Sequence, residues 1–453
     1  MKYVPQWIRQ SSVLAWGILF ILLSVSVTQY GGTNALSRDA ALRAITEGHT
    51  LSIDNYRDWT IDWAHAPNGH YYSNKAPGPV FLGLPLMVIL DAVIIPLQSH
   101  RIDKQGRAPQ PPYAEYLLLM LWLQIIPFFL LVLYICHRLE IIGLPLPAIH
   151  FFALAAFFGN TAAIYMNSNF GHGVAGMLFL GAFFFWWEKR YVLTGLFLSW
   201  ALLSDYGVAF ALPFFLIATL LRERKIRALM DIGVGAIPGA CVWIWYHTVC
   251  FGSPFHTGNQ YTNAEQIETL PGMISLWGEY SPFPSPLILV QLLFGETRGI
   301  LFTQPWMFAV FLLPFQRGTA RGLGLLAFGS LAGLLWMNGG FGGWHGGWCV
   351  GPRYPSVVYP AMALALALCW INFNRQERWL LWCGLAVALL FRVLVYPFSN
   401  LAPEEPLWAY HLKHIPDHLG TNALRFAMAF AFIAAALYWQ RRRGEFPFSQ
   451  KSV

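Results

Sequence analysis

The sequence predicts an all-α membrane protein that crosses the bilayer many times, and three observations lead to this fold class. Charged residues make up 11% of the 453 residues, whereas soluble domains carry about 25%. The mean hydropathy is +0.48. Several uncharged apolar stretches also reach about 18 residues, the length that a membrane-spanning helix needs. This composition excludes a soluble enzyme, a disordered chain and a nucleic-acid-binding domain.

The apolar stretches predict about twelve spans in a single integral membrane domain, residues 1–453. Residues 192–221 form an apolar block broken by Ser204, Asp205 and Tyr206 and flanked by basic clusters, which predicts a hairpin of two short helices. Asp205 at its tip suits a helix cap or a cavity-facing acid. The other expected spans are 12–30, 113–135, 145–165, 171–187, 228–250, 301–316, 322–338, 355–373, 378–396 and 423–439.

The orientation depends on residues 80–97, which are apolar but contain Pro85, Asp91 and Pro96. If this segment spans the bilayer, the basic clusters at 222–227 and 441–443 face outward, against the positive-inside rule. We therefore expect a juxtamembrane or re-entrant helix on the external side. Both termini are then cytoplasmic, and the net charge of +7 reflects orientation in the membrane.

Three external segments are too long to be simple turns: 31–112, 251–300 and 397–422. The first concentrates acids beside imidazoles and a lysine, and its main candidates are Asp54, Asp62, His70, Tyr72 and Lys75. Such a set supplies a general base and an anion-binding group, although each acid taken alone suits an ordinary solvated loop. We therefore expect any chemistry to face outward.

The first loop resembles that of bacterial GT-C glycosyltransferases, near the protein mannosyltransferase and aminoarabinose transferase families (glycosyltransferase family 39-like). The residues that carry the resemblance are SRDAALRAITEGHTLSID (37–54) and TIDWAHAPNGHYYSNKAPG (60–78). Looser matches follow in the hairpin at 195–213, in FGSPF (251–255) with FGETRGILFTQP (294–305), and in GGWHGGWCVGPRYPSVVYP (342–360). The resemblance implies a GT-C-like fold, with periplasmic juxtamembrane helices in the first loop, in a bacterial inner membrane.

The resemblance also implies the reaction. Such an enzyme transfers a sugar from a polyprenyl-phosphate donor to a lipid, glycan or protein acceptor at the periplasmic face, usually with inversion, and uses a loop Asp as base. Those families carry this Asp shortly before an Arg, but alignment on Arg38 puts Ala35 there, with Asp39 out of register. The role therefore passes to Asp62 or Asp54, of which Asp62 lies closer to the GHYYSNK segment.

The leaving phosphate needs positive charge, and Arg298 and Arg353 both lie beside glycines at external ends of expected spans. Their guanidinium groups, Lys75 and the neighbouring Tyr354 are candidates for substrate binding, although snorkelling arginines would look the same. Arg392 and Arg425 lie within or near expected spans. An arginine in a membrane-spanning segment has either a functional role or a structural partner.

No cofactor is firmly implied and no metal ligand spacing is present. A divalent ion bound by external histidines is a weaker candidate; these histidines are His70, His172, His256 and His345. The partners expected are the lipid-linked sugar donor, a lipid or glycan acceptor and membrane lipids, with no nucleic acid. The main alternative is a transporter, flippase or ligase of lipid-linked glycans. Transporters are usually built from repeated halves, and no repeat is visible here.

Overall fold

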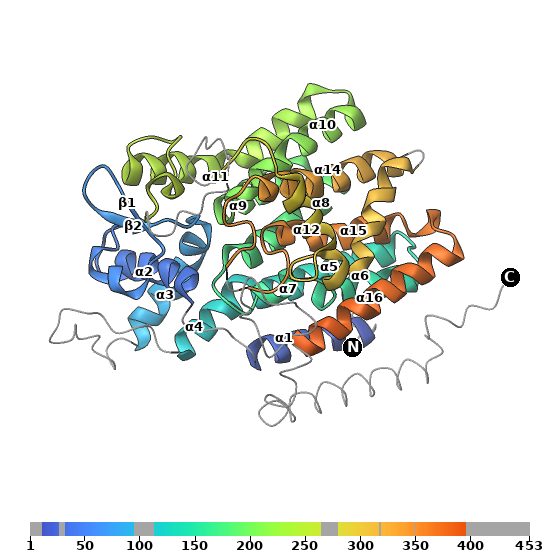
Figure 1. Cartoon of the computed structure of the whole chain (residues 1–453), viewed down its shortest axis with the longest axis horizontal. Helices are drawn as coiled ribbons and strands as arrows, with labels where there is room; N and C mark the ends of the chain where they lie inside the picture. The colour runs from blue at the N-terminus through green and yellow to red at the C-terminus, as the bar shows by residue number, and fades with distance from the viewer. Residues whose placement is uncertain are drawn as a thin grey trace, which may run out of the picture.

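The computed structural model describes residues 11–26, 32–94, 113–263, 280–316, 319–347 and 349–395, and it is mostly helical (Figure 1). The α-helices are α1 (Ser11–Ser26), α2 (Thr33–Thr46), α3 (Gly78–Ile94), α4 (Tyr113–Met120), α5 (Ile126–Ile141), α6 (Leu146–Phe157), α7 (Ala162–Tyr165), α8 (Gly171–Trp187), α9 (Tyr191–Ser204), α10 (Leu212–Glu223), α11 (Ile226–Phe251), α12 (Pro286–Phe294), α13 (Ile300–Thr303), α14 (Thr319–Gly339), α15 (Tyr359–Leu368) and α16 (Arg375–Val395).

Shorter elements connect these helices. One antiparallel hairpin, β1 (Trp63–His65) with β2 (Tyr71–Ser73), follows α2 and pairs Trp63 with Ser73. A π-helical turn, Leu121–Ile125, joins α4 to α5. The 3-10 segments are Asp54–Trp59, Tyr206–Ala211, Gly258–Tyr261, Pro305–Phe315, Tyr354–Val358 and Trp370–Asn372.

Within the described part of the chain, four helical segments are long and apolar enough to cross a membrane. They are Tyr113–Ile141, Tyr206–Glu223, Ile226–Phe251 and Ala320–Gly339. Shorter apolar helices occupy several of the other expected spans. The mostly helical fold is therefore confirmed, and the four apolar helices agree with the expected membrane protein, while the count of about twelve spans and the GT-C-like fold stay predictions. The expected span 423–439, the loop 397–422 and Arg425 lie outside the described residues.

The two short helices expected at 192–221 are present as α9 and α10, joined by a 3-10 turn that follows the break at Asp205. Asp205 adopts an extended backbone, and its carboxylate accepts a hydrogen bond from the Gly207 backbone N–H at 2.9 Å. That bond begins the 3-10 turn, so the residue acts as the cap that the sequence suggested.

Three expected spans differ from continuous helices, and one of them, 301–316, is divided at Gln304 into α13 and the 3-10 segment Pro305–Phe315. Residues 145–165 are divided into α6 and α7, because the Asn160 amide bonds the carbonyls of Ala155 and Ala156 at 2.6 and 2.8 Å. The segment 355–373 is divided into a 3-10 turn, α15 and a second 3-10 turn. The uniformly apolar sequence gives no sign of these breaks. The backbone N–H and C=O groups that lose their helical partners there are bonded by other groups inside the protein.

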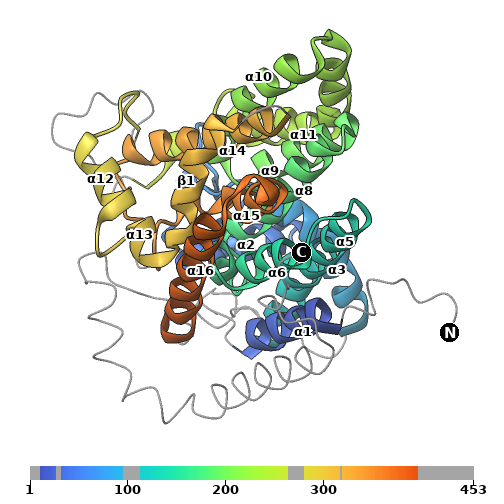
Figure 2. The same cartoon turned by 90° about the vertical axis from the view of Figure 1, so that its right-hand side faces the viewer.

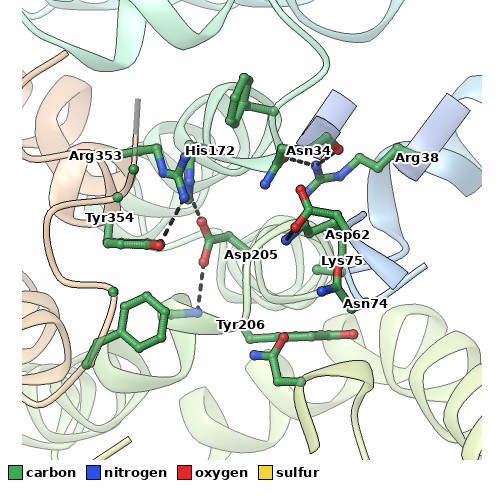
Figure 3. Close-up of a pocket in the computed structure, with 18 of the residues that line it drawn as sticks. Asn34, Arg38, Asp62, Asn74, Lys75, His172, Asp205, Tyr206, Arg353 and Tyr354 are labelled. Carbon is green, nitrogen blue, oxygen red and sulfur yellow. Dashed lines mark hydrogen bonds and ion pairs between the residues drawn. The ribbon is translucent and has the colours of Figure 1, made fainter. Parts of the chain in front are cut away.

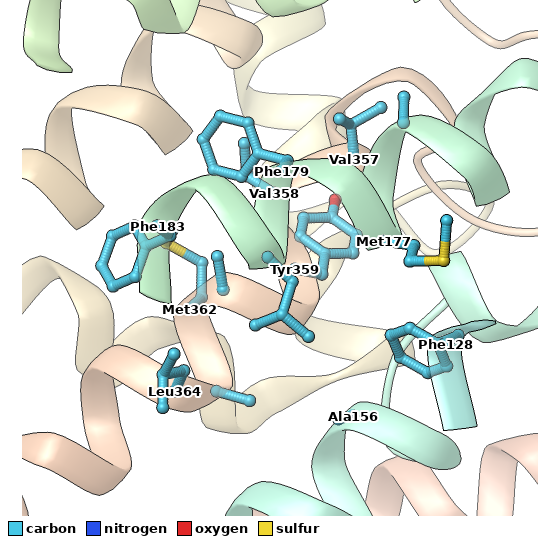
Figure 4. Packing of buried hydrophobic residues seen from close by; sticks show 14 of the residues in the cluster. Phe128, Ala156, Met177, Phe179, Phe183, Val357, Val358, Tyr359, Met362 and Leu364 are labelled. Atoms are coloured by element: carbon cyan, nitrogen blue, oxygen red, sulfur yellow. The ribbon is translucent and has the colours of Figure 1, made fainter. Parts of the chain in front are cut away.

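Helix α8 lies at the centre of the core. Its residues are buried around most of the helix circumference, as expected for a helix that is apolar on all sides. Figure 4 shows Met177, Phe179 and Phe183 of this helix packed against Tyr359 and Met362 of α15. The N-terminus of α8 is thereby held in a fixed position, where it reaches the cavity described below.

The first loop folds at one side of the helical body. Helices α2 and α3 and the β1–β2 hairpin lie together there (Figure 1), whereas α10 and α1 lie at opposite ends in both views (Figures 1 and 2). The apolar segment expected at 80–97 is the helix α3, which contains Pro85. Its juxtamembrane position stays a prediction.

Candidate functional site

A cavity of about 670 Å³ opens where the ends of several elements meet. The start of α2, the residues flanking the β1–β2 hairpin, the start of α8 and the turn after α9 all contribute to its wall. Figure 3 shows Arg353, Tyr354, His172 and Asp205 on one side, facing Arg38, Asp62 and Lys75 on the other. Its volume falls in the range of small-molecule sites, about 300–1,000 Å³.

Asp62 and Lys75 form an ion pair in the cavity wall, with 3.0 Å between Oδ1 and Nζ. Antiparallel pairing of Trp63 with Ser73 brings the residues just outside the two strands together. The Ser37 hydroxyl bonds the Asp62 carbonyl at 2.5 Å and the Ser73 hydroxyl at 2.7 Å, so α2 is fixed to this end of the hairpin.

The electrostatics of this pair favour its charged form. Burial alone would raise the pKa of the Asp62 carboxyl, but the Lys75 ammonium has the opposite effect, and the pKa lies below its ordinary value. Burial lowers the pKa of Lys75, and Asp62 opposes that shift. At neutral pH Asp62 is therefore an ionised carboxylate that is already neutralised by its partner.

Arg38 and Arg353 bring two guanidinium groups to the cavity. Arg38 bonds the side chain of Asn34 at 2.5 Å and the carbonyl of Asn169 at 3.2 Å. Burial lowers its pKa to about 10, which still leaves it protonated at neutral pH. Arg353 bonds the Tyr354 hydroxyl at 3.0 Å and lies over the ring of Phe170 at 5.4 Å.

Neither guanidinium forms an ion pair with a carboxylate in the described part of the chain. The Nε atoms of both arginines are buried and make no hydrogen bond to any described residue. A buried cation is costly unless an anion or hydrogen-bond acceptors offset its desolvation. The two arginines are therefore suited to an anionic group that enters the cavity.

His172 and Asp205 form a hydrogen-bonded pair on the cavity wall that faces Asp62 and Lys75 (Figure 3). The His172 Nδ1 bonds one oxygen of Asp205, and the other oxygen receives the Gly207 N–H. Both residues line the cavity. Asp205 thus both caps its turn and orients an imidazole.

Four of the site residues expected from the sequence line the cavity: Asp62, Lys75, Arg353 and Tyr354. Asp54 and His70 do not. They pair with each other at 2.7 Å on the surface, with side chains 41% and 56% exposed. The structure thus separates the two aspartates that the sequence left as alternatives.

The remaining two expected residues also lie away from the cavity lining. Tyr72 is buried against Phe251, and its hydroxyl accepts a hydrogen bond from Asn68 at 2.9 Å. Arg298 is fully buried and donates to the carbonyls of His345 and Gly347 at 3.0 and 3.2 Å. Because Gly347 lines the cavity, Arg298 shapes the wall from behind.

Sequence reasoning missed Arg38 as a site residue, since it served only to align the first loop, and it missed the pairing of His172 with Asp205. The sequence offers one sign of the role of Arg38: Asn34, which holds its guanidinium, lies four residues earlier, one turn back on α2. This spacing becomes meaningful only once the helix is known. His172 and Asp205 are 33 residues apart, and no short motif links them. Among the described residues, no group of three or more His, Cys, Asp or Glu side chains is arranged to hold a metal ion.

Comparison with protein-family models, with curated proteins and with solved structures finds no match to this chain. The functional argument therefore depends on the cavity itself.

Proposed function

We propose that the chain is a GT-C-type membrane glycosyltransferase. It takes a sugar from a polyprenyl-phosphate donor and transfers it, with inversion, to a hydroxyl of a lipid, glycan or protein acceptor at the periplasmic face of a bacterial inner membrane. One observation carries the proposal: Arg38 and Arg353, without carboxylate partners among the described residues, face the same cavity as the acidic groups Asp62 and Asp205.

The paired guanidinium groups suit the donor phosphate. A phosphate monoanion accepts charge-assisted hydrogen bonds from arginine, and its charge grows as the bond to the sugar breaks. Lys75 adds a third cation to the same wall, although Asp62 already neutralises it. These groups therefore stabilise the leaving group without a general acid.

The acidic groups suit the other half of the reaction. The acceptor hydroxyl must lose a proton as it attacks the sugar. Asp62, the loop aspartate expected from the sequence, and the Asp205–His172 pair both line the cavity. Ala35, which occupies the position of the family's catalytic Asp, also lines it. Asp62 is thus available in the region where that carboxylate would otherwise lie.

The test uses the full-length protein in lipid nanodiscs with a panel of radiolabelled undecaprenyl-phosphate sugars and an extract of envelope lipids and glycans as acceptors. We expect transfer by the wild type, and for Arg353→Gln a KM for the donor raised roughly 10- to 100-fold, as loss of a charged hydrogen-bond partner predicts. Arg57→Gln is the matched control, because Arg57 is exposed, stacks on Tyr71 at 4.2 Å and does not line the cavity.

Two outcomes would contradict the proposal. The first is movement of the lipid-linked sugar across the bilayer with no transfer by the wild type, which would indicate a flippase. The second is an equal change in the donor KM for Arg353→Gln and Arg57→Gln, which would remove the cavity from donor binding.

A further inference from the structure

The His172–Asp205 pair has the arrangement of an oriented proton acceptor. Asp205 receives Nδ1 of the imidazole and the Gly207 N–H, so both of its oxygens are engaged. Burial would raise the pKa of the Asp205 carboxyl, but His172 and the Gly207 N–H lower it below its ordinary value. Asp205 is therefore a carboxylate, which requires Nδ1 to carry the hydrogen and leaves the lone pair on Nε2.

Nε2 is open to the cavity. It makes no hydrogen bond with any described residue, and it is not among the enclosed, unpartnered polar atoms. The imidazole is held on its other sides by the rings of Phe170, Tyr165 and Tyr354, at centroid distances of 6.3, 5.7 and 5.6 Å. The ring orientation is thus fixed, and the basic nitrogen is presented to whatever occupies the cavity.

Asp62 is less well equipped for the same task. Its ion pair with Lys75 lowers its affinity for a proton, and an efficient general base has a pKa near the operating pH. The Asp62 carboxylate is already held by the Lys75 ammonium, at 3.0 Å from Oδ1 to Nζ, whereas Nε2 of His172 has no hydrogen-bond partner among the described residues. Of the two candidate bases in the cavity, Asp62 and His172, the imidazole of His172 is the better proton acceptor.

We propose that His172 Nε2 is the general base of the transfer reaction, with Asp205 as its positioning residue and Asp62 contacting the substrate without accepting the proton. This inference rests on the proposed function. The acceptor oxygen bonds to the anomeric carbon of the sugar while the bond from that carbon to the phosphate oxygen breaks, and its electron pair leaves with polyprenyl phosphate. The hydroxyl proton passes to Nε2, Asp205 stabilises the imidazolium, and the proton is then released to water in the cavity.

The test compares His172→Gln with His150→Gln in the nanodisc transfer assay. His150 is a buried histidine of α6 that does not line the cavity, so His150→Gln should keep the wild-type kcat. For His172→Gln we expect kcat to fall at least 100-fold, as for loss of a general base. The affinity for undecaprenyl phosphate alone, measured by tryptophan fluorescence, should stay within twofold of the wild type.

Two further variants separate a chemical role from a structural one. Exogenous imidazole should restore turnover to His172→Ala, because the vacated space opens into the cavity. Asp205→Asn should lower kcat with an unchanged KM for the donor, because the amide can reverse the hydrogen-bond direction at Nδ1.

Retention of the wild-type kcat by His172→Gln, together with its loss in Asp62→Asn, would overturn the inference and return the base to Asp62. Failure of imidazole to restore any activity to a folded His172→Ala would also overturn it. Both results presuppose a wild type that transfers sugar, so they leave the proposed function standing. Absence of transfer by the wild type would overturn the two together.

Discussion

Asp39 follows Arg38 in the chain, yet it lies away from the cavity that Arg38 lines. It is buried with Arg43 and Glu115, and its carboxylate accepts a hydrogen bond from Asn169 at 2.8 Å. Burial, with the nearby charge of Glu115, raises its pKa to about 7. The two adjacent residues of α2 therefore have different roles. Arg38 brings positive charge to the cavity, whereas Asp39 is a buried carboxyl that holds its proton up to a higher pH than usual.

This raised pKa predicts a pH dependence of stability. Between the unfolded value of 3.8 and about 7 the folded chain binds more protons than the unfolded chain, so the free energy of unfolding falls as the pH rises through that window. The slope approaches about 1.4 kcal/mol per pH unit. Thermal unfolding in detergent at pH 5.5 and pH 8 should show Asp39→Asn gaining stability over the wild type at the higher pH.

Asp58→Asn is the control for this measurement, because Asp58 is exposed in the same loop. It should follow the wild-type pH dependence. Equal displacement of both variants from the wild type at pH 8 would argue against a buried, proton-storing Asp39.

Helices α9 and α11 show how packing between elements positions the site. A Cβ at Gly195 would lie 1.9 Å from the Ile232 carbonyl oxygen, and one at Gly235 would lie 1.8 Å from that of Val192. The two backbones therefore touch through glycine, as at many helix contacts in membrane proteins. Because Asp205 follows α9 directly, this contact sets the depth at which the turn reaches the cavity.

Gly235→Ala should therefore push α9 away from α11 and lower the free energy of unfolding by about 1–3 kcal/mol. It should also lower transfer activity, because Asp205 is displaced. The matched control is Gly233→Ala on the same helix, where an added Cβ meets nothing within 4 Å. This control should be neutral or slightly stabilising, since alanine is the better helix former. Thermal unfolding and the transfer assay measure both effects; equal behaviour of the two variants would refute the contact's role.

The orientation of the protein in the membrane is the largest expectation still open to test. The basic clusters predict that the turn between α10 and α11 is cytoplasmic and that the first loop is periplasmic. Asp58 and Lys225 are both exposed, which makes them a matched pair of labelling sites.

We expect a membrane-impermeant maleimide to label Asp58→Cys in intact spheroplasts and Lys225→Cys only after lysis, in a background lacking the exposed Cys241. Labelling of Lys225→Cys from outside would reverse the predicted orientation and place the cavity on the cytoplasmic side.

Much of the helical framework follows from the chain's apolar pattern. The segments 171–187 and 228–250 are found as α8 and α11 within a few residues, and the break at Asp205 is present. In the first loop the structure adds the helix α2, which begins at Thr33. The breaks after Phe157 and after Leu368 were not predicted, because they occur where the sequence is still apolar and the freed polar groups are satisfied by distant parts of the chain.

Composition and charge were enough to indicate an all-α membrane protein and to single out the first loop, because hydrophobic length and basic flanks act locally along the chain. Only the tertiary structure separated Asp62 from Asp54, since the register of β1 with β2 brings Asp62 to Lys75 and leaves Asp54 at the surface. It likewise brought His172 to Asp205 and aimed Arg38 and Arg353 at one cavity. Such convergence depends on packing between remote segments, which no local pattern of residues encodes.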